Sequence, residues 1–150
     1  MGLIEDLGPG VVGVDTAVFI YLIEEDPRFL EALTPLFSQA DQGRRELVTS
    51  AVTLLEVLVV PYRSGHGALA ARYEALLLGS RGIRVAEITR DQLRAAAQLR
   101  AATAVKTPDA LQLVAALAAG CTAFVTNDRR LPDIAGLRVF QLSAYAAPNR

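Results

Sequence analysis

Four acidic residues each interrupt an apolar stretch of the chain: Asp15, Glu56, Asp109 and Asp128. No charged residue lies between Asp109 and Asp128, and the other two acids each stand alone in runs that carry no other charge. A lone carboxylate at the edge of a hydrophobic core is unfavourable unless a positive or hydrogen-bonding group meets it. The chemistry of this chain therefore depends on what meets these four acids.

A shared cation would explain all four acids at once. Two carboxylates about 4 Å apart repel by roughly 4 kcal/mol at an effective dielectric constant of 20, so four converging carboxylates need a cation. Oxygen ligands without histidine or cysteine favour Mg²⁺ or Mn²⁺ over zinc. Such an ion tends to receive phosphate, and it can activate water for attack on a phosphodiester. We therefore expect metal-ligand roles for Asp15, Glu56, Asp109 and Asp128.

Each acid taken alone also has a structural interpretation. Asp15 and Asp109 lie where helices are expected to start, and the helix macrodipole favours an acid there by up to about 1 kcal/mol. Asp128 suits a turn in which it caps Arg129 or a nearby amide. Glu56 lies beyond the first turn of its helix among leucine and valine residues, so a buried arginine partner is its main structural alternative.

Strands and helices alternate along the chain. Apolar patterns and turn residues predict strands over residues 11–14, 47–49, 83–85, 121–126 and 137–142. Helices are expected over residues 17–25, 28–42, 51–62, 68–78, 90–104 and 108–119, with Ser50 and Thr107 as caps for two of them. This order predicts an α/β fold with a central parallel sheet of four to five strands flanked by helices. Sites in such sheets form at the carboxyl ends of the strands, which places Asp15, Ser50 and Asp128 along one edge.

The composition indicates one domain. The chain has 150 residues, of which 52% are hydrophobic, so it can bury one core and is not a disordered tail. Cys121 is the only cysteine, which excludes an internal disulfide and a cysteine zinc site. The uncharged run over residues 110–125 contains Gln112 and is interrupted by Gly120, so we do not expect a membrane span. Residues 1–6 carry no basic side chain of a signal peptide, and we expect a cytoplasmic protein.

Several motifs together resemble the PIN-domain ribonucleases, and among them the VapC-type toxins of prokaryotic toxin–antitoxin pairs. They are Asp15-Thr16, Glu56 on a helix after Ser50, the segment TPDAL at residues 107–111, and the segment FVTNDRRL at residues 124–131. No single motif is specific, but their order, spacing and hydroxyl-bearing neighbours are specific together. The similarity spans about residues 11–142 of a single PIN-like domain over residues 1–150.

The resemblance implies a metal-dependent endoribonuclease with the four acids around Mg²⁺ or Mn²⁺. It implies that a metal-activated water cleaves RNA and leaves 5′-phosphate and 3′-hydroxyl ends. It also implies a homodimer and a cognate antitoxin that silences the enzyme. Four further residues would orient the acids or the attacking water through hydrogen bonds: Thr16, Ser50, Thr126 and Asn127.

The charge balance departs from that of a typical nucleic-acid binder. The formal net charge is −1, and nearly all the positive charge is arginine, with Lys106 as the only lysine. Substrate RNA would therefore have to be met by local arginines, which grip phosphate through two hydrogen bonds. Arg129 and Arg130 are the better candidates for RNA contact because they adjoin Asp128.

Two other functions stay open at this point. One is a phosphoryl-accepting receiver or phosphatase-like domain, in which Asp15 or another acid is phosphorylated with help from Thr126 and Lys106. Asp15 has no acid directly before it or two residues after it, and Glu56 is expected on a helix, which argues against this function. The other is a catalytically silent PIN module that binds a protein partner, and the four intact acids argue against that.

Overall fold

Five short strands form one parallel sheet at the centre of the structure, a computed structural model that describes residues 2–148. The strands are β1 (Val12–Val14), β2 (Leu47–Ser50), β3 (Ile83–Ala86), β4 (Ala123–Thr126) and β5 (Arg138–Gln141). They are hydrogen-bonded in the order β3-β2-β1-β4-β5, and every neighbouring pair is parallel. The predicted α/β class with a parallel sheet of four to five strands is confirmed.

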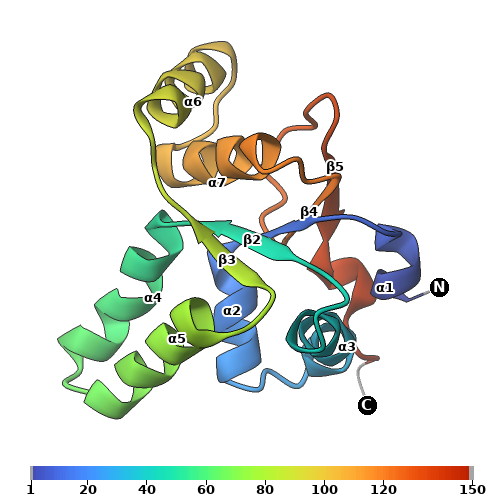
Figure 1. Ribbon diagram of the computed structural model, residues 1–150, viewed down its shortest axis with the longest axis vertical. Helices are drawn as coiled ribbons and strands as arrows, with labels where there is room; N and C mark the ends of the chain where they lie inside the picture. Colours follow the sequence, from blue (N-terminus) through green and yellow to red (C-terminus); the bar gives the residue numbers. More distant parts are fainter. Residues whose placement is uncertain (1, 149–150) are drawn as a thin grey trace.

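Seven α-helices flank this sheet within residues 2–148. They are α1 (Leu3–Leu7), α2 (Thr16–Ile23), α3 (Leu30–Asp41), α4 (Val52–Arg63), α5 (Gly67–Gly79), α6 (Arg90–Ala102) and α7 (Thr107–Ala118). A short 3₁₀ helix, η1 (Leu142–Tyr145), follows β5. Helices α6 and α7 lie on one side of the sheet, above it in Figure 1, and α2 to α5 lie on the other. The chain therefore has three layers.

Side chains of the central strands alternate between two hydrophobic cores. Val12 and Val14 of β1 join the core shared with α1 to α5, and so do Ala123 and Val125 of β4. Phe124, between the latter two, points to the opposite side and joins the core under α6 and α7. This period of two is expected for strands that are covered on both faces.

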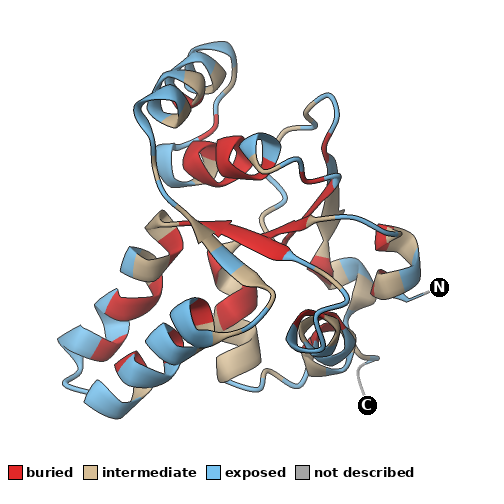
Figure 2. Cartoon of the chain, viewed as in Figure 1, coloured by how far each residue is buried: buried red, intermediate tan, exposed pale blue. Residues whose placement is uncertain are grey.

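Helix α7 is held close to β1. Residues 110–116 of α7 are all buried, because the sheet covers one side of the helix and α6 covers the other (Figure 2). A Cβ atom at Gly13 would lie 2.7 Å from Cδ1 of Phe124 and 3.0 Å from Cβ of Ala116. Glycine at position 13 therefore lets the helix approach the strand, which places Asp109 near Asp15.

The cap assignments made from the sequence were wrong at two helices. Helix α7 begins at Thr107 with Lys106 as its N-cap, and Thr107 instead accepts a hydrogen bond from Arg100 at 2.8 Å. Helix α4 has Ala51 at its N-cap, and Ser50 one residue earlier accepts only a long bond of 3.3 Å from the N–H of Val52. In both cases the helix boundary lies one residue from the expected position. The hydroxyl of Thr107 bonds Arg100 instead of a helix N–H, whereas that of Ser50 still accepts an N–H of the first turn.

Two short elements were not predicted. Helix α1 and the 3₁₀ helix η1 contain five and four residues, which is too short for a periodic pattern to stand out. Both attach to the sheet through buried leucines, Leu3 and Leu7 in α1 and Leu142 in η1. The uncharged run over residues 110–125 is divided between α7 and β4, and no helix in the described part of the chain is long and apolar enough to cross a membrane.

Candidate active site

The four isolated acids line one pocket of about 520 Å³ at the carboxyl edge of the sheet. Asp15 and Asp128 follow β1 and β4, Asp109 lies in the first turn of α7, and Glu56 lies in the middle of α4. Because β1 and β4 are parallel neighbours, the residues that follow them meet at one edge. The other lining residues are Thr16, Ala17, Ile20, Tyr21, Asn127, Arg129 and Arg130.

Both carboxylate oxygens of Asp15 are held in place. Oδ1 accepts a hydrogen bond from the backbone N–H of Thr16 at 2.8 Å, and Oδ2 accepts one from the hydroxyl of Thr126 at 2.6 Å. Burial raises the pKa of Asp15, these two bonds partly offset that rise, and the charge of Asp128 adds to it. Thr126 also accepts the N–H of Asp128 at 3.0 Å, so one hydroxyl links two of the acids.

Glu56 faces a hydroxyl group. Its Oε1 accepts a hydrogen bond from the hydroxyl of Thr16 at 2.7 Å. No ion pair within residues 2–148 involves Glu56, so the alternative of a buried arginine partner was wrong. A carboxylate in the middle of an otherwise apolar helix therefore points to the pocket and is oriented by its neighbour Thr16.

Asp109 is the acid at which the charges of the other three converge. Burial raises its pKa first, and the negative charges of Asp15, Asp128 and Glu56 raise it further, while Arg130 partly offsets them. Its side chain makes no hydrogen bond to another residue within the described range. Asp109 is thus a half-buried carboxylate among like charges, which is the arrangement that a cation relieves.

Asp128 is paired with its neighbour Arg130. The guanidinium donates from Nε to Oδ1 at 3.0 Å and from Nη2 to Oδ2 at 3.1 Å, and the backbone N–H of Arg130 adds a bond of 2.9 Å. These contacts lower the pKa of Asp128. The Arg130 side chain is 74% exposed, and exposed ion pairs contribute little net stability, so the guanidinium can leave for another anion.

The predicted hydroxyl and amide residues divide into two groups. Thr16 and Thr126 bond directly to acids, as described above. Ser50 lies at the buried end of β2, does not line the pocket, and donates its N–H to Oε1 of Gln112 at 3.0 Å. Asn127 lines the pocket, but it bonds the hydroxyl of Tyr21 at 3.3 Å and the N–H of Ser143 at 3.0 Å. The structure brings neither Ser50 nor Asn127 into contact with an acid, and their roles stay predictions.

One residue of the site was missed in the sequence. Gln112 is 2% exposed and donates from Nε2 to Thr53 at 2.6 Å and to Thr16 at 3.2 Å. Gln112 could have been found from its spacing: it lies three residues after Asp109, and residues three apart share a face of a helix. An uncharged amide within a buried helix must find hydrogen-bond partners, and here they adjoin the acids.

The pocket has no closed set of metal ligands. Within residues 2–148, no group of three acidic, histidine or cysteine side chains could hold a metal ion as the side chains stand. A structural zinc site needs such a closed set, whereas Mg²⁺ takes one or two carboxylates and keeps several waters. Four carboxylates around a water-accessible pocket provide ligands of that kind.

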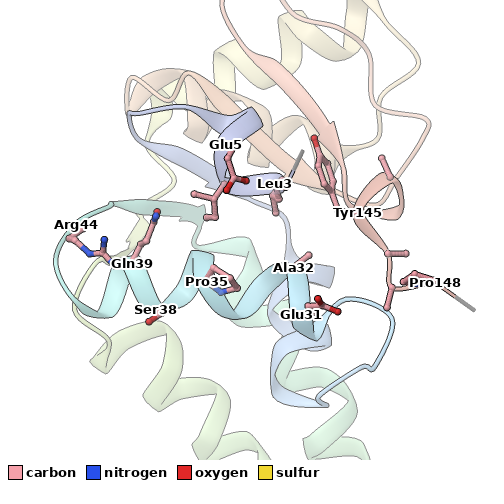
Figure 3. Close-up of a pocket in the computed structure, with 15 residues that line it drawn as sticks. Leu3, Glu5, Glu31, Ala32, Pro35, Ser38, Gln39, Arg44, Tyr145 and Pro148 are labelled. Atoms are coloured by element: carbon pink, nitrogen blue, oxygen red, sulfur yellow. The ribbon is translucent and has the colours of Figure 1, made fainter. Parts of the chain in front are cut away.

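A larger pocket of about 640 Å³ lies elsewhere in the molecule and shares no lining residue with the acidic one. Figure 3 shows it between α1, α3 and the C-terminal segment, with Glu5, Glu31 and Tyr145 on its walls. None of the four isolated acids lies there. Size alone therefore does not separate the two pockets, and the four isolated acids lie in the smaller one.

Comparison with known protein families assigns this fold. The model of the PIN domain family matches residues 12–137. The chain belongs to the PIN-domain family. No curated protein sequence matches the chain significantly.

Solved structures share the fold of this PIN domain at low sequence identity. VapBC2 from Rickettsia felis, bound to a DNA fragment from its promoter, has a TM-score of 0.67 at 15% identity, covering 88% of this chain and 98% of that chain. VapC20 from Mycobacterium tuberculosis, a sarcin–ricin loop cleaving toxin, has a TM-score of 0.61 at 18% identity, covering 75% and 86%. DNA-bound VapBC from Salmonella typhimurium has a TM-score of 0.61 at 22% identity, covering 87% and 97%.

Proposed function

We propose that this PIN domain is a metal-dependent endoribonuclease, the toxin of a toxin–antitoxin pair. The observation that carries the proposal is the meeting of Asp15, Glu56, Asp109 and Asp128 around one pocket, where burial and the charges of the other three acids raise the pKa of Asp109. The similar Mycobacterium tuberculosis structure is that of a toxin that cleaves the sarcin–ricin loop, which supports RNA as the substrate class.

The cofactor is Mg²⁺ or Mn²⁺. The four acids offer hard oxygen ligands, and the pocket contains no histidine or cysteine. The bound ion would activate water and stabilise the charge that develops on the phosphodiester during displacement. Relief of the repulsion around Asp109 favours binding of the cation to the folded chain.

The residues of the chain have separate tasks in this proposal. Asp15, with both oxygens fixed, and Asp109, without a hydrogen bond of its own in the described residues, present carboxylates to the ion. Thr16 keeps Glu56 turned to the pocket, and Thr126 aligns Asp15 with Asp128. These contacts orient the acids before substrate arrives, which lowers the reorganisation that the reaction requires.

Arg129 and Arg130 bind the RNA backbone at the rim of the pocket. Both line it and both are exposed. Arg130 makes a bidentate contact with the carboxylate of Asp128, and a phosphate can accept two hydrogen bonds in the same way. Exchange of Asp128 for a phosphate would free the acid and hold the substrate next to it. Binding of the RNA backbone by two local arginines does not require a positive net charge, and it is therefore compatible with the formal net charge of −1.

The partners of the enzyme are a cognate antitoxin and a second copy of the chain, and it acts in the cytoplasm. The solved relatives support an antitoxin partner, because the Klebsiella pneumoniae structure is a toxin–antitoxin complex and those from Rickettsia felis and Salmonella typhimurium are VapBC structures. The antitoxin would have to cover or fill the acidic pocket to silence it.

The test is cleavage of total cellular RNA with Mg²⁺ or Mn²⁺ and with a chelator. Wild type is compared with Asp15→Asn, Asp109→Asn and the control Asp91→Asn, which makes the same change at a side chain that is 94% exposed on α6. We expect wild type and Asp91→Asn to produce 5′-phosphate ends only with the ion, and both site variants to lose activity. Equal cleavage by all four proteins would reject the mechanism. Cleavage by none would favour a catalytically silent binding module.

A further inference from the structure

A buried amide ties the acidic pocket to the centre of the fold. Gln112 lies on α7 one turn after Asp109, and its side chain bonds atoms of three other elements, α2, α4 and β2. Nε2 lies 2.6 Å from the hydroxyl of Thr53 and 3.2 Å from that of Thr16. Oε1 lies 3.0 Å from the N–H of Ser50 and 3.3 Å from the hydroxyl of Thr49.

The orientation of this amide follows from its partners. The backbone N–H of Ser50 can only donate, so the atom that faces it at 3.0 Å must be the oxygen of Gln112. The amide nitrogen therefore faces Thr16 and Thr53 and donates one proton to each. A flipped amide would place two donors against each other at Ser50.

The donors around Thr16 follow from this orientation of the amide. Each hydroxyl has a single proton to donate. Thr16 accepts from Gln112 and donates to Glu56 at 2.7 Å. Thr53 lies 2.6 Å from the hydroxyl of Thr49 and 3.0 Å from that of Thr16, and either hydroxyl can be the donor in the bond with Thr49. Because Thr16 donates to Glu56, Thr53 is the hydroxyl that can donate in the bond with Thr16. Gln112 therefore donates a hydrogen bond to Thr16, and Thr16 donates one to Glu56.

We propose that Gln112 is a positioning residue that fixes the hydroxyl of Thr16 and, through it, the carboxylate of Glu56 in the pocket. The N–H of Gln112 occupies one lone pair of Thr16, which limits the directions in which the Thr16 hydroxyl can donate, and Glu56 lies in one of these directions at 2.7 Å. The consequence for RNA cleavage rests on the proposed function, whereas the positioning itself is a property of the folded chain. Loss of a residue that orients a metal ligand typically lowers metal affinity or activity by about 10- to 100-fold.

Two variants separate positioning from stability. Gln112→Met has a side chain of similar length and no amide, so Thr16 loses the hydrogen bond from Nε2 of Gln112. Thr53→Val is nearly isosteric and breaks the same buried network, but it leaves the bonds from Gln112 to Thr16 and from Thr16 to Glu56. Both variants leave buried polar groups unpaired, so both should unfold at lower temperature than wild type. Only Gln112→Met should lower kcat, by about 10- to 100-fold with little change in the KM for RNA.

The deciding readout is the crystal structure of each variant. We expect the 2.7 Å contact between Thr16 Oγ1 and Glu56 Oε1 to persist in Thr53→Val and to be lost in Gln112→Met. Persistence of that contact in Gln112→Met would overturn the proposal, and so would a wild-type kcat in that variant. If Gln112→Met does not fold, Gln112→Glu replaces the NH₂ group by oxygen at nearly constant shape and is judged by the same distance. If the contact is lost as expected but wild type cleaves no RNA, the positioning stands and the proposed function fails.

Discussion

The hydroxyl of Thr126 lies 2.6 Å from Oδ2 of Asp15, although 111 positions of the chain separate them. The pairing of β1 with β4 explains this contact, because Val14 lies opposite Val125 and the next residue of each strand reaches the same edge. Thr126 then accepts the N–H of Asp128. The meeting of Asp15 with Thr126 and Asp128 is therefore a direct consequence of the order of strands in the sheet.

The first prediction concerns the stability that the protein loses by holding its acids together. Because burial and, after it, like charges raise the pKa of Asp109, its ionised form is unfavourable in the fold. We expect Asp109→Asn to raise Tm at pH 7 in the presence of a chelator. Asp91→Asn removes an ion pair with Arg94, but the Asp91 side chain is 94% exposed and such pairs contribute little, so Tm should change little. A lower Tm for Asp109→Asn would show that the carboxylate has a stabilising partner.

The second prediction concerns the ion. A ligand that binds only the folded state stabilises it, by about 2.7 kcal/mol at a concentration 100 times Kd. Millimolar Mg²⁺ or Mn²⁺ should therefore raise the Tm of wild type, and thermal unfolding with and without the ion measures the shift. Asp109→Asn should lose most of this shift, so the two proteins should reverse their order of Tm when the ion is added. The absence of any shift in wild type would count against a cation site.

The third prediction concerns pH. The pKa of Asp109 is raised above its ordinary value of 3.8, so between that value and its folded pKa the folded state binds more protons than the unfolded state. Asp109 therefore destabilises the fold increasingly as pH rises through that range. We expect the stability advantage of Asp109→Asn in chelator to shrink as pH falls from 7 toward 4, as measured by urea unfolding at a series of pH values. An advantage that grows as the solution becomes more acidic would give the wrong sign.

The effect of Asp128 on stability changes with pH in the opposite direction to that of Asp109, because Arg130 is bonded to it. The hydrogen bonds from Arg130 lower the pKa of Asp128, so this pair adds stability that is lost only as pH falls below the ordinary value of 3.8.

Arg130 also competes with a cation for the carboxylate of Asp128. The fourth prediction is that Arg130→Ala tightens Mn²⁺ binding, measured by calorimetry, while raising the KM for RNA. Arg129→Ala, which removes a charge of the same sign at the same rim, should not tighten Mn²⁺ binding as strongly. Weaker Mn²⁺ binding by Arg130→Ala would contradict this competition.

The fifth prediction concerns the fold. Gly82 has φ +85° just before β3, and a Cβ atom there would lie 2.2 Å from the backbone oxygen of Ala40. Gly136 has the same φ of +85° but nothing within 4 Å of such a Cβ atom. Gly136→Ala should cost about 1–2 kcal/mol of unfolding free energy from backbone strain alone. Gly82→Ala should cost roughly 1–3 kcal/mol more, because the backbone must move to relieve the clash. Equal losses in urea unfolding would show that the fold absorbs the clash.

Much of this arrangement could be read from the sequence. Lone acids after apolar strands predicted the positions of Asp15 and Asp128, because parallel strands end at one edge. Asp109 and Glu56 also line the predicted pocket, and the PIN family was identified from the motifs around all four. The catalytic roles of the acids, and of the residues beside them, stay predictions.

The parts of the site that could not be predicted depend on contacts between residues far apart in the sequence. The bonds of Asn127 to Tyr21 and Ser143 are of this kind, whereas the contact of Asp128 with the N–H of Arg130 is local and fits the turn expected at Asp128. Gln112 was noticed in the sequence only as a polar residue in an apolar run. Its four partners come from positions 16, 49, 50 and 53, and only the packing of α7 against β2 and α4 brings them together.

The most direct test of the account is anomalous diffraction from a crystal soaked in Mn²⁺. We predict an anomalous peak inside the pocket, within ligand distance of oxygens from Asp15 and at least one of Glu56, Asp109 and Asp128. A well-ordered structure with no manganese in this pocket, at Mn²⁺ concentrations that support RNA cleavage, would contradict the claim that the four acids hold the ion.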